Sequence, residues 1–414
     1  QYKNDFKKFS LESIKGKSNY KCALNNCLNC ECGLCIADYK IQKKCKENFT
    51  CNYFNQRNKV INSNIFLTTY QYAFRAFDCA SWCKPRNVLI FDECHLIEQQ
   101  ITQWASMDLS IKNLQTEFKL FDDYDLNILV KLGDIPEKPG YNNCKNWIKT
   151  IHQVICEVKN KRYEDIKKTL KSQGKNIESI DDNILEDILE NHKDYYLLDK
   201  FYKKLDVFLQ SSSKDSWLIE PTEDGLILTP TDVNDIFKKF IDKMAIDKIV
   251  FMSATILDLS SFRDRLGLNK DNTYMLKADS EFNPNNSPII YKPICKMNYQ
   301  SLENNLGLIK CAVEEVLKKH PNEKGIIHTG NQKISKYLMD NIKSDRLLVR
   351  YGNVVNSDII NIHANSNKPT VLVSSSLGDG VDLKDDLSRF QIIIKLQFDN
   401  LKDKRIEYLK NKDN

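Results

Sequence analysis

The amino-acid sequence predicts an α/β fold built on parallel sheets. Residues 88–91, Val-Leu-Ile-Phe, form a short and continuous apolar run of the kind found in strands that are buried on both faces. A second β-prone run covers residues 248–252. After it, helix-like stretches alternate with strand signals at 324–328, 370–374 and 390–396. Such alternation is typical of a parallel sheet whose strands are joined by helices.

A helical insert interrupts this pattern between residues 104 and 213. In 147–158 and again in 184–189, apolar side chains recur every three or four positions, which is the spacing of one face of a helix. We therefore expect an inserted helical domain between the first and the second strand.

Length and charge set broad limits. A chain of 414 residues has room for two or three domains of ~100–200 residues each. Its 61 basic and 56 acidic residues give a net charge of +5, so binding to nucleic acid would have to rest on local basic patches. No apolar run approaches the ~20 residues of a membrane span, and the first eight residues carry no signal core. We expect a soluble, intracellular protein, cytoplasmic or nuclear, without a membrane partner.

Seven of the fourteen cysteines crowd between Cys22 and Cys51. In a large chain without a signal peptide, such clustering indicates a metal site and not a set of disulfides. The segment 19–54 has little hydrophobic periodicity, so we expect a loop-rich region that needs its metal to fold.

The spacing of these cysteines, taken alone, favours a structural zinc ion. Cys27 and Cys30 form one Cys-x-x-Cys pair and Cys32 and Cys35 form another, and two such pairs are typical zinc ligands. The choice between zinc and an iron-sulfur cluster stays open on spacing.

The residues that follow the first strand carry the clearest chemistry. Asp92, Glu93 and His95 stand at its C-terminal end, which is where α/β sheets place functional groups. Asp92 can hold Mg²⁺ on nucleotide phosphates, and Glu93 can orient and deprotonate an attacking water. His95 would sense the γ-phosphate or relay to the next motif. A strand that simply ends in a polar turn is the plain alternative.

Two motifs at strand ends resemble those of a known superfamily. Residues 92–95, Asp-Glu-Cys-His, resemble the DEAH-type Walker B box of superfamily 2 helicases. Ser253, Ala254 and Thr255, after the second strand, resemble the Ser-Ala-Thr motif that couples hydrolysis to domain movement in these enzymes.

The strand and turn at 325–331 resemble the opening of the second motor domain. The resemblance implies that Thr329 and Gly330 there, with Ser374 after the next strand, approach DNA phosphates.

Residues 378–383, Gly-Asp-Gly-Val-Asp-Leu, resemble the family motif Glu-Gly-Val-Asp-Leu, which faces the nucleotide. Gly380 and Asp382 would take that role, and Asp379 stands in place of the usual glutamate.

The cysteine region also resembles a known signature. Residues 14–22, Ile-Lys-Gly-Lys-Ser-Asn-Tyr-Lys-Cys, resemble the segment that leads into the iron-sulfur domain of DinG-like enzymes, and residues 51–54 resemble its last ligand motif, with Asn52 in place of proline. The resemblance implies a [4Fe-4S] cluster held by four thiolates, and it reverses the preference for zinc. The implied ligands are Cys22, Cys35, Cys45 and Cys51, with Cys30 and Cys32 as possible replacements.

The order of these motifs is that of XPD-like and DinG-like helicases. It implies two RecA-like parallel-sheet motor domains, the first of which carries an iron-sulfur insert and a helical arch insert. The implied division is a partial first motor domain at 1–103 with the iron-sulfur insert at 19–54, the arch at 104–213, a return to the first motor domain at 214–256, and a partial second motor domain at 257–414. The implied function is ATP-dependent 5′→3′ translocation on single-stranded DNA and unwinding of forked duplex DNA, with ATP, Mg²⁺ and a [4Fe-4S] cluster.

Two motifs of such a motor do not occur in residues 1–414. They are a Gly-x-x-x-x-Gly-Lys-Ser/Thr loop, which cradles phosphates, and a Gln-x-x-Gly-Arg-x-x-Arg segment. We interpret the chain as a truncated enzyme that is almost inactive alone. The alternative is a metal-stabilised module that binds single-stranded nucleic acid without ATP turnover.

Overall fold

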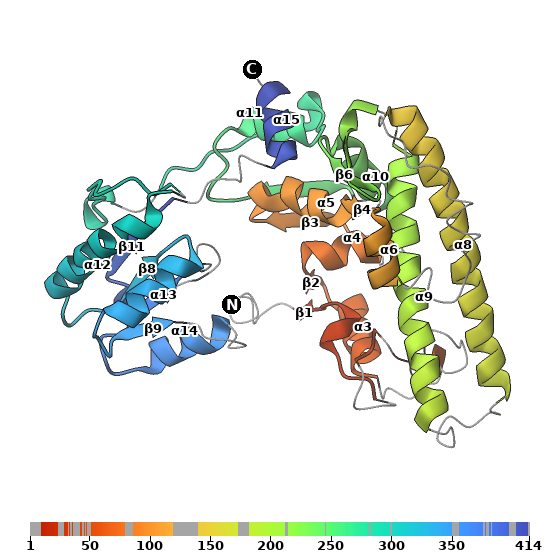
Figure 1. Ribbon diagram of the computed structural model, residues 1–414, viewed down its shortest axis with the longest axis horizontal. Coiled ribbons are helices and arrows are strands. Elements are labelled where there is room, and N and C mark those ends of the chain that lie inside the picture. Colours follow the sequence, from red (N-terminus) through yellow and green to blue (C-terminus); the bar gives the residue numbers. More distant parts are fainter. Residues whose placement is uncertain are drawn as a thin grey trace. The chain divides into compact units, whose positions relative to one another are not determined.

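The computed structural model describes the chain in two compact units, made of residues 1–276 with 408–414 and of residues 277–407 (Figure 1). The residues described are 10–23, 29–31, 33, 35, 42–43, 45, 47, 51–78, 86–118, 140–172, 182–211, 214–244, 246–280, 283–298, 300–349, 356–375, 377, 381, 383–396 and 403–412. Both units contain parallel strands and helices, so the α/β fold with parallel sheets is confirmed.

Parallel strand pairs form the centre of unit 1. Strand β3 (Val88–Asp92) pairs with β7 (Lys248–Met252), and β1 (Leu11–Ser13) pairs with β2 (Ile65–Leu67). Phe91 of β3 stacks on Phe251 of β7 at 5.3 Å between ring centroids. Three helices pack against these rings, namely α4 (Tyr70–Asp78), α5 (Ile97–Ala105) and α10 (Asn234–Met244).

Only one face of the β3–β7 pair is covered by the described residues. Phe91 is 5% exposed, whereas Val88 and Ile90 are 47% and 59% exposed. On β7, Val250 and Met252 are 44% exposed. The expectation of a strand buried on both faces is therefore wrong for this structure. A continuous apolar run fits both a fully buried and a half-covered strand, because the run itself does not say which face is packed.

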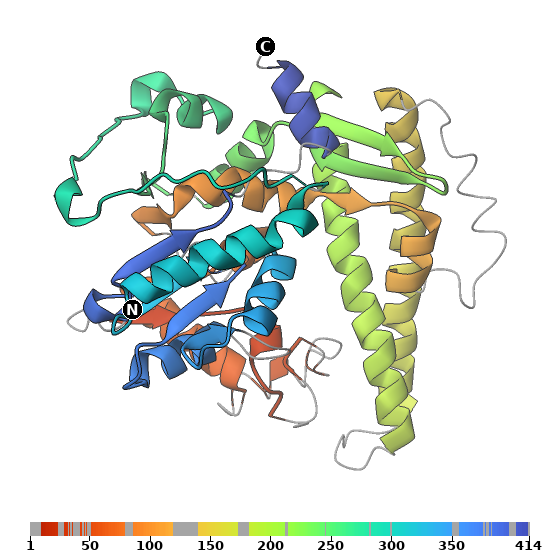
Figure 2. The same ribbon diagram turned by 60° about the vertical axis from the view of Figure 1, so that its left-hand side comes forward.

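A long helical hairpin lies in the range where the sequence predicts a helical insert. Helices α8 (Tyr141–Ser172) and α9 (Asp182–Leu209) run side by side in both views (Figures 1 and 2). Their apolar faces share one core, and ion pairs join them, such as Arg162 with the buried Asp194 at 3.0 Å. The hairpin core continues onto a three-stranded antiparallel sheet, β4 (Met107–Asp108), β6 (Leu226–Pro230) and β5 (Trp217–Pro221).

Unit 2 is a parallel sheet with helices on both faces. The strand order is β11 (Phe390–Ile393), β8 (Gly325–His328), β10 (Val371–Ser374) and β9 (Leu347–Val349). Helices α12 (Leu302–Lys319) and α13 (Gln332–Asn341) share a core with one face of this sheet, and α14 (Asn356–Asn365) packs on residues of the other face. Alternate side chains of the central strands enter the two cores, as expected for a buried parallel sheet.

The remaining helices are shorter. They are α3 (Asn52–Asn62), α6 (Ile111–Phe118), α11 (Leu259–Arg265) and α15 (Lys404–Lys412). In the part of the chain that the structure describes, every helix is either too short or too polar to cross a membrane.

Candidate functional site

The first candidate site is the turn that follows β3. The strand ends at Asp92, and Glu93 then takes a left-handed conformation with φ of 50° and ψ of 46°. A 3-10 turn, η3 (Cys94–Leu96), leads directly into α5. A left-handed conformation is uncommon for a residue that carries a Cβ, costs ~1–3 kcal/mol, and is concentrated at functional sites.

A small hydrogen-bond network joins this turn to the end of β7. Ser253 Oγ lies 2.8 Å from His95 Nδ1 and donates to Glu93 Oε2 at 3.3 Å. The backbone N–H of Thr255 donates to the same serine oxygen at 3.2 Å. These bonds are mutually consistent when His95 carries its proton on Nδ1, because Ser253 then accepts two hydrogens and donates its own.

The parallel register of β3 and β7 explains this meeting. Asp92 lies opposite Met252, so the residues after both strands emerge at the same edge of the sheet. The structure therefore brings together Glu93, His95, Ser253 and Thr255, while Ala254 stays exposed beside them.

The turn is open to a ligand. The Glu93 side chain is 55% exposed and that of His95 is 28% exposed, and Asp92 is partly buried. An open carboxylate pair at a strand end can take a hydrated Mg²⁺ on one group and a water molecule on the other.

Tyr70 belongs to this site and was missed by reasoning from the sequence. Its hydroxyl donates to the carbonyl oxygen of Asp92 at 2.8 Å. Burial raises the pKa of this phenol. No local sequence signal marks it, because its contact depends on how α4 packs beside the end of β3.

In unit 2, the residues expected to contact DNA lie at one edge of the sheet. The N–H of Thr329 donates to the carbonyl oxygen of Ser374 at 2.9 Å, so the ends of β8 and β10 are adjacent. Thr329 is fully buried, and its hydroxyl lies 2.7 Å from Ser335 Oγ. Gly330, with φ of 62°, and Ser374 are partly exposed. A contact with DNA at this edge would therefore come from Gly330 and Ser374 and not from the Thr329 hydroxyl.

Gly380 and Asp382 lie outside the described residues. Their described neighbours Val381 and Leu383 pack on the core that contains Ile359 of α14.

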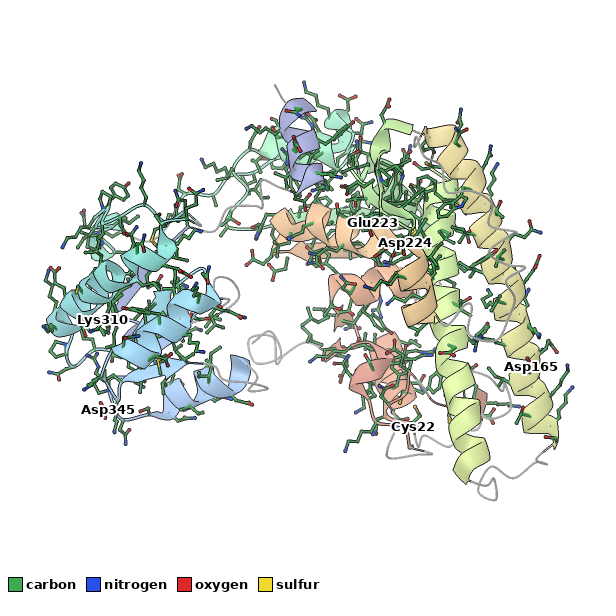
Figure 3. All side chains as sticks on the ribbon, in the orientation of Figure 1. Cys22, Asp165, Glu223, Asp224, Lys310 and Asp345 are labelled. Carbon is green, nitrogen blue, oxygen red and sulfur yellow. The ribbon has the colours of Figure 1, made fainter. Side chains whose placement is uncertain are left out.

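The second candidate site is a group of buried thiols in unit 1, here named the cysteine pocket: Cys22, Cys30, Cys35, Cys45 and Cys51. Each is between 3% and 6% exposed. Cys32 lies outside the described residues. Figure 3 labels Cys22, which lies in the same region as α3.

The sulfurs of the cysteine pocket approach one another. Cys30 Sγ lies 3.7 Å from Cys51 Sγ. A Cβ placed on Gly33 would lie 3.4 Å from Cys22 Sγ and 3.5 Å from Cys35 Sγ, so these two sulfurs flank the glycine backbone.

Burial favours the neutral form of two of these thiols, whereas a hydrogen bond with Cys30 lowers the pKa of Cys51 to about 6. Burial raises the pKa of Cys35 to about 12, and it raises the pKa of Cys45. Neighbouring thiols add to both shifts. Bound metal would remove this penalty, because a metal ion deprotonates its thiol ligands and neutralises their charge.

Among the described residues, no three ligand side chains form a group that could hold a single metal ion.

Comparisons with known proteins find one family region and a shared fold. Residues 17–114 match the DEAD_2 family. The solved structure named XPD_Helicase is similar over 98% of this chain and 75% of its own length, at 13% identity and a TM-score of 0.52. A structure of S. tokodaii Xpd4 aligns with the whole chain and 79% of its own length, at 11% identity and a TM-score of 0.46. No curated protein matches the sequence. The chain thus has a DEAD_2 region and resembles the XPD helicase structure in its fold, as the sequence predicts.

Proposed function

We propose that this XPD-like chain, with a DEAD_2 region at 17–114 and the fold of an XPD helicase, is the motor of an ATP-dependent DNA helicase. It would couple ATP hydrolysis to 5′→3′ translocation on single-stranded DNA and unwind forked duplexes. The observation that carries the proposal is the contact of Glu93 and His95 with Ser253, which joins the carboxylate pair to the second strand end.

Each residue of this network has a distinct task in the proposal. Asp92 would hold Mg²⁺, which neutralises charge on the β- and γ-phosphates. Glu93 would orient the attacking water and accept its proton. Ser253 contacts both Glu93 and His95, so a movement of the chain after β7 would reach the base directly. That contact is a physical route from hydrolysis to movement.

The second unit would supply the opposite side of the reaction. Gly380 and Asp382 would face the nucleotide, and Gly330 and Ser374 would contact DNA phosphates. Backbone N–H groups and short polar side chains are suited to phosphate contacts that do not depend on base sequence. We therefore expect binding to single-stranded DNA with little sequence preference that weakens as salt rises.

The cysteine pocket would hold a [4Fe-4S] cluster. The burial of five thiols, two of which flank the backbone of Gly33, supports this assignment. When bound, the cluster would tie together a loop-rich segment that has little regular structure of its own. The quartet is proposed as Cys22, Cys35, Cys45 and Cys51, with Cys30 or Cys32 as replacements.

The proposed division follows these roles. A first motor domain would comprise 1–103 and 214–256, with the iron-sulfur insert at 19–54. The hairpin of α8 and α9 would form an arch within 104–213, and residues 257–414 would form the second motor domain.

Replacement of one carboxylate tests the proposal. In the chain as its gene encodes it, Glu93→Gln should reduce DNA-stimulated ATP hydrolysis by roughly 10²–10⁴-fold and leave nucleotide affinity unchanged, since general-base catalysis contributes a factor of that size. Glu98→Gln is the matched control, because Glu98 contacts Arg265 instead of the network.

The outcomes of this experiment distinguish an ATP-hydrolysing motor from a binding module without ATP turnover. Single-stranded DNA binding without any hydrolysis by the encoded chain would favour the metal-stabilised binding module. Hydrolysis that survives Glu93→Gln would show that the base lies elsewhere.

A further inference from the structure

We propose that Tyr70 is a positioning residue that locks the peptide between Asp92 and Glu93 in the orientation needed for hydrolysis. This inference rests on the function proposed above. Tyr70 would touch neither nucleotide nor metal, and it would act through the backbone that carries the two carboxylates.

The peptide between Asp92 and Glu93 is held at both ends. Its carbonyl oxygen, which belongs to Asp92, accepts the Tyr70 hydroxyl hydrogen at 2.8 Å. Its N–H, which belongs to Glu93, donates to Asp92 Oδ1 at 3.0 Å. Because a peptide group is planar, fixing its oxygen and its nitrogen fixes the rotation of the whole unit.

That rotation decides the conformation of Glu93. Its φ of 50° is set by how the preceding peptide is turned, and a flip of this peptide would let the residue leave the strained left-handed region. A flip would also carry the carbonyl oxygen away from Tyr70. The hydrogen bond therefore opposes the relaxation that would redirect the Glu93 carboxylate.

The tyrosine ring is itself fixed, so its hydroxyl has a defined position. Tyr70 is the first residue of α4 and stacks on Phe91 at 5.7 Å between centroids and 11° between planes. Phe74, one helical turn later, packs on the same ring at 6.2 Å. Phe91 immediately precedes Asp92, so the ring and the hydroxyl hold consecutive residues of the same strand end.

The same helix provides a matched control. Tyr72, two residues farther along α4, points its hydroxyl to Tyr53 instead, at 3.0 Å between the two oxygens. Tyr53 and Tyr72 both belong to the core that includes the cysteine pocket. Tyr70→Phe and Tyr72→Phe remove the same atom from one helix, and only the first removes a contact with the turn.

The decisive measurement does not require catalysis. Hydrogen exchange of a peptide covering 88–97 is followed in residues 1–414 for the wild type, Tyr70→Phe and Tyr72→Phe. We expect the amides after Asp92 to exchange about fivefold faster in Tyr70→Phe, the effect of one lost hydrogen bond, and at the wild-type rate in Tyr72→Phe. Equal exchange in all three proteins would overturn the proposal.

The kinetic measurement uses the encoded chain with ATP, Mg²⁺ and single-stranded DNA. Tyr70→Phe should lower kcat roughly tenfold and change KM for ATP by less than about twofold, because misplaced catalytic groups reduce the rate without removing the nucleotide contacts. Equal kcat in Tyr70→Phe and Tyr72→Phe would contradict the positioning role. If the wild type does not hydrolyse ATP, the proposed function fails, and the exchange experiment still decides whether Tyr70 holds the peptide.

Discussion

The Asp92–Glu93 turn and the cysteine pocket lie in the same unit but differ in how exposed their side chains are. The turn must stay accessible, and its Glu93 side chain is 55% exposed. The pocket is closed, and its five thiols are at most 6% exposed. The turn is held by hydrogen bonds from neighbouring backbone and side chains, whereas the pocket gathers buried thiols, and burial raises the pKa of two of them, Cys35 and Cys45. An exposed site can therefore be held in place by hydrogen bonds, and in the function proposed above the buried site would gain part of its stability from its cluster.

The largest expected difference between the two regions concerns metal. Chain purified without oxygen should contain about four irons and four sulfides, and Cys51→Ser should lose them, because a thiolate ligand cannot be replaced by a hydroxyl. Loss of the cluster should also raise hydrogen exchange in α3, since metal binding contributes to folding. Iron and sulfide analysis with exchange measurements tests both effects.

Cys144→Ser is the control for this experiment. Cys144 is a fully buried thiol in the hairpin core, outside the cysteine pocket. It should keep the iron content of the wild type. Stoichiometric zinc without iron in the wild type would contradict the proposed cluster. An unchanged iron content in Cys51→Ser would contradict the assignment of Cys51 as a ligand.

Substitution of Arg86, which contacts the helix that follows Cys51, should have an intermediate effect on stability. Its guanidinium donates to the carbonyl oxygens of Ser63 at 2.6 Å and Val60 at 3.0 Å, at the end of the helix that follows Cys51. Arg86→Ala should lower the free energy of unfolding by about 2–3 kcal/mol, and Arg86→Lys should restore little of it because an ammonium lacks the two-pronged geometry.

Lys59→Ala, on the exposed surface of the same helix, should change the free energy of unfolding by less than ~0.5 kcal/mol. Urea denaturation measures both variants. An Arg86→Ala protein as stable as the Lys59→Ala protein would mean that this support is dispensable.

The smallest expected effect is a pH dependence that arises in unit 2. Burial lowers the pKa of the buried His363 and of the half-buried His328, which both lie in unit 2. His363 Nε2 lies 2.8 Å from the Leu387 carbonyl oxygen, and Nδ1 lies 2.8 Å from Thr370 Oγ1. The unfolded chain takes up a proton near pH ~6.5 and the folded unit does so only at lower pH. Stability should thus be complete above pH ~6.5 and decline below it, by at most ~1.4 kcal/mol per pH unit for each histidine.

Unfolding midpoints of wild type and His363→Gln between pH 7 and pH 5 test this. The slope against pH should be smaller in the variant. Identical slopes would assign the acid sensitivity to another group, and loss of iron over the same range would show that acid acts on the pocket as well.

The two regions also differ in how far the sequence could reveal them. The strand and turn around Asp92 are local, and a run of 88–91 followed by two carboxylates was enough to predict both. The partners Ser253 and Thr255 could be named because they follow a second strand signal. Tyr70 could not, since its contribution depends on which strands are neighbours and on a ring packed against Phe91.

The cysteine pocket could be predicted from the sequence only in part, for a related reason. Spacing identified a metal region but favoured zinc, because Cys-x-x-Cys pairs look alike whichever metal they serve. Which thiols converge depends on how a loop-rich segment folds, and Cys30, assigned only as a replacement ligand, lies beside Cys51. The sequence also does not indicate which face of β3 is exposed, since Val88 and Ile90 are as apolar as their packed neighbours.

The left-handed conformation of Glu93 affects which residues can replace it during evolution. Glycine carries no Cβ, so it accepts this conformation without the steric penalty of ~1–2 kcal/mol. Its greater freedom in the unfolded chain costs only ~0.4–1 kcal/mol of that gain in stability. Glu93→Gly should therefore fold at least as stably as the wild type, and more stably than Glu93→Ala, while it loses the carboxylate. Stability and chemistry pull this position in opposite directions. If Glu93 is the base proposed above, a lineage that no longer hydrolysed ATP would be free to drift toward glycine at this position.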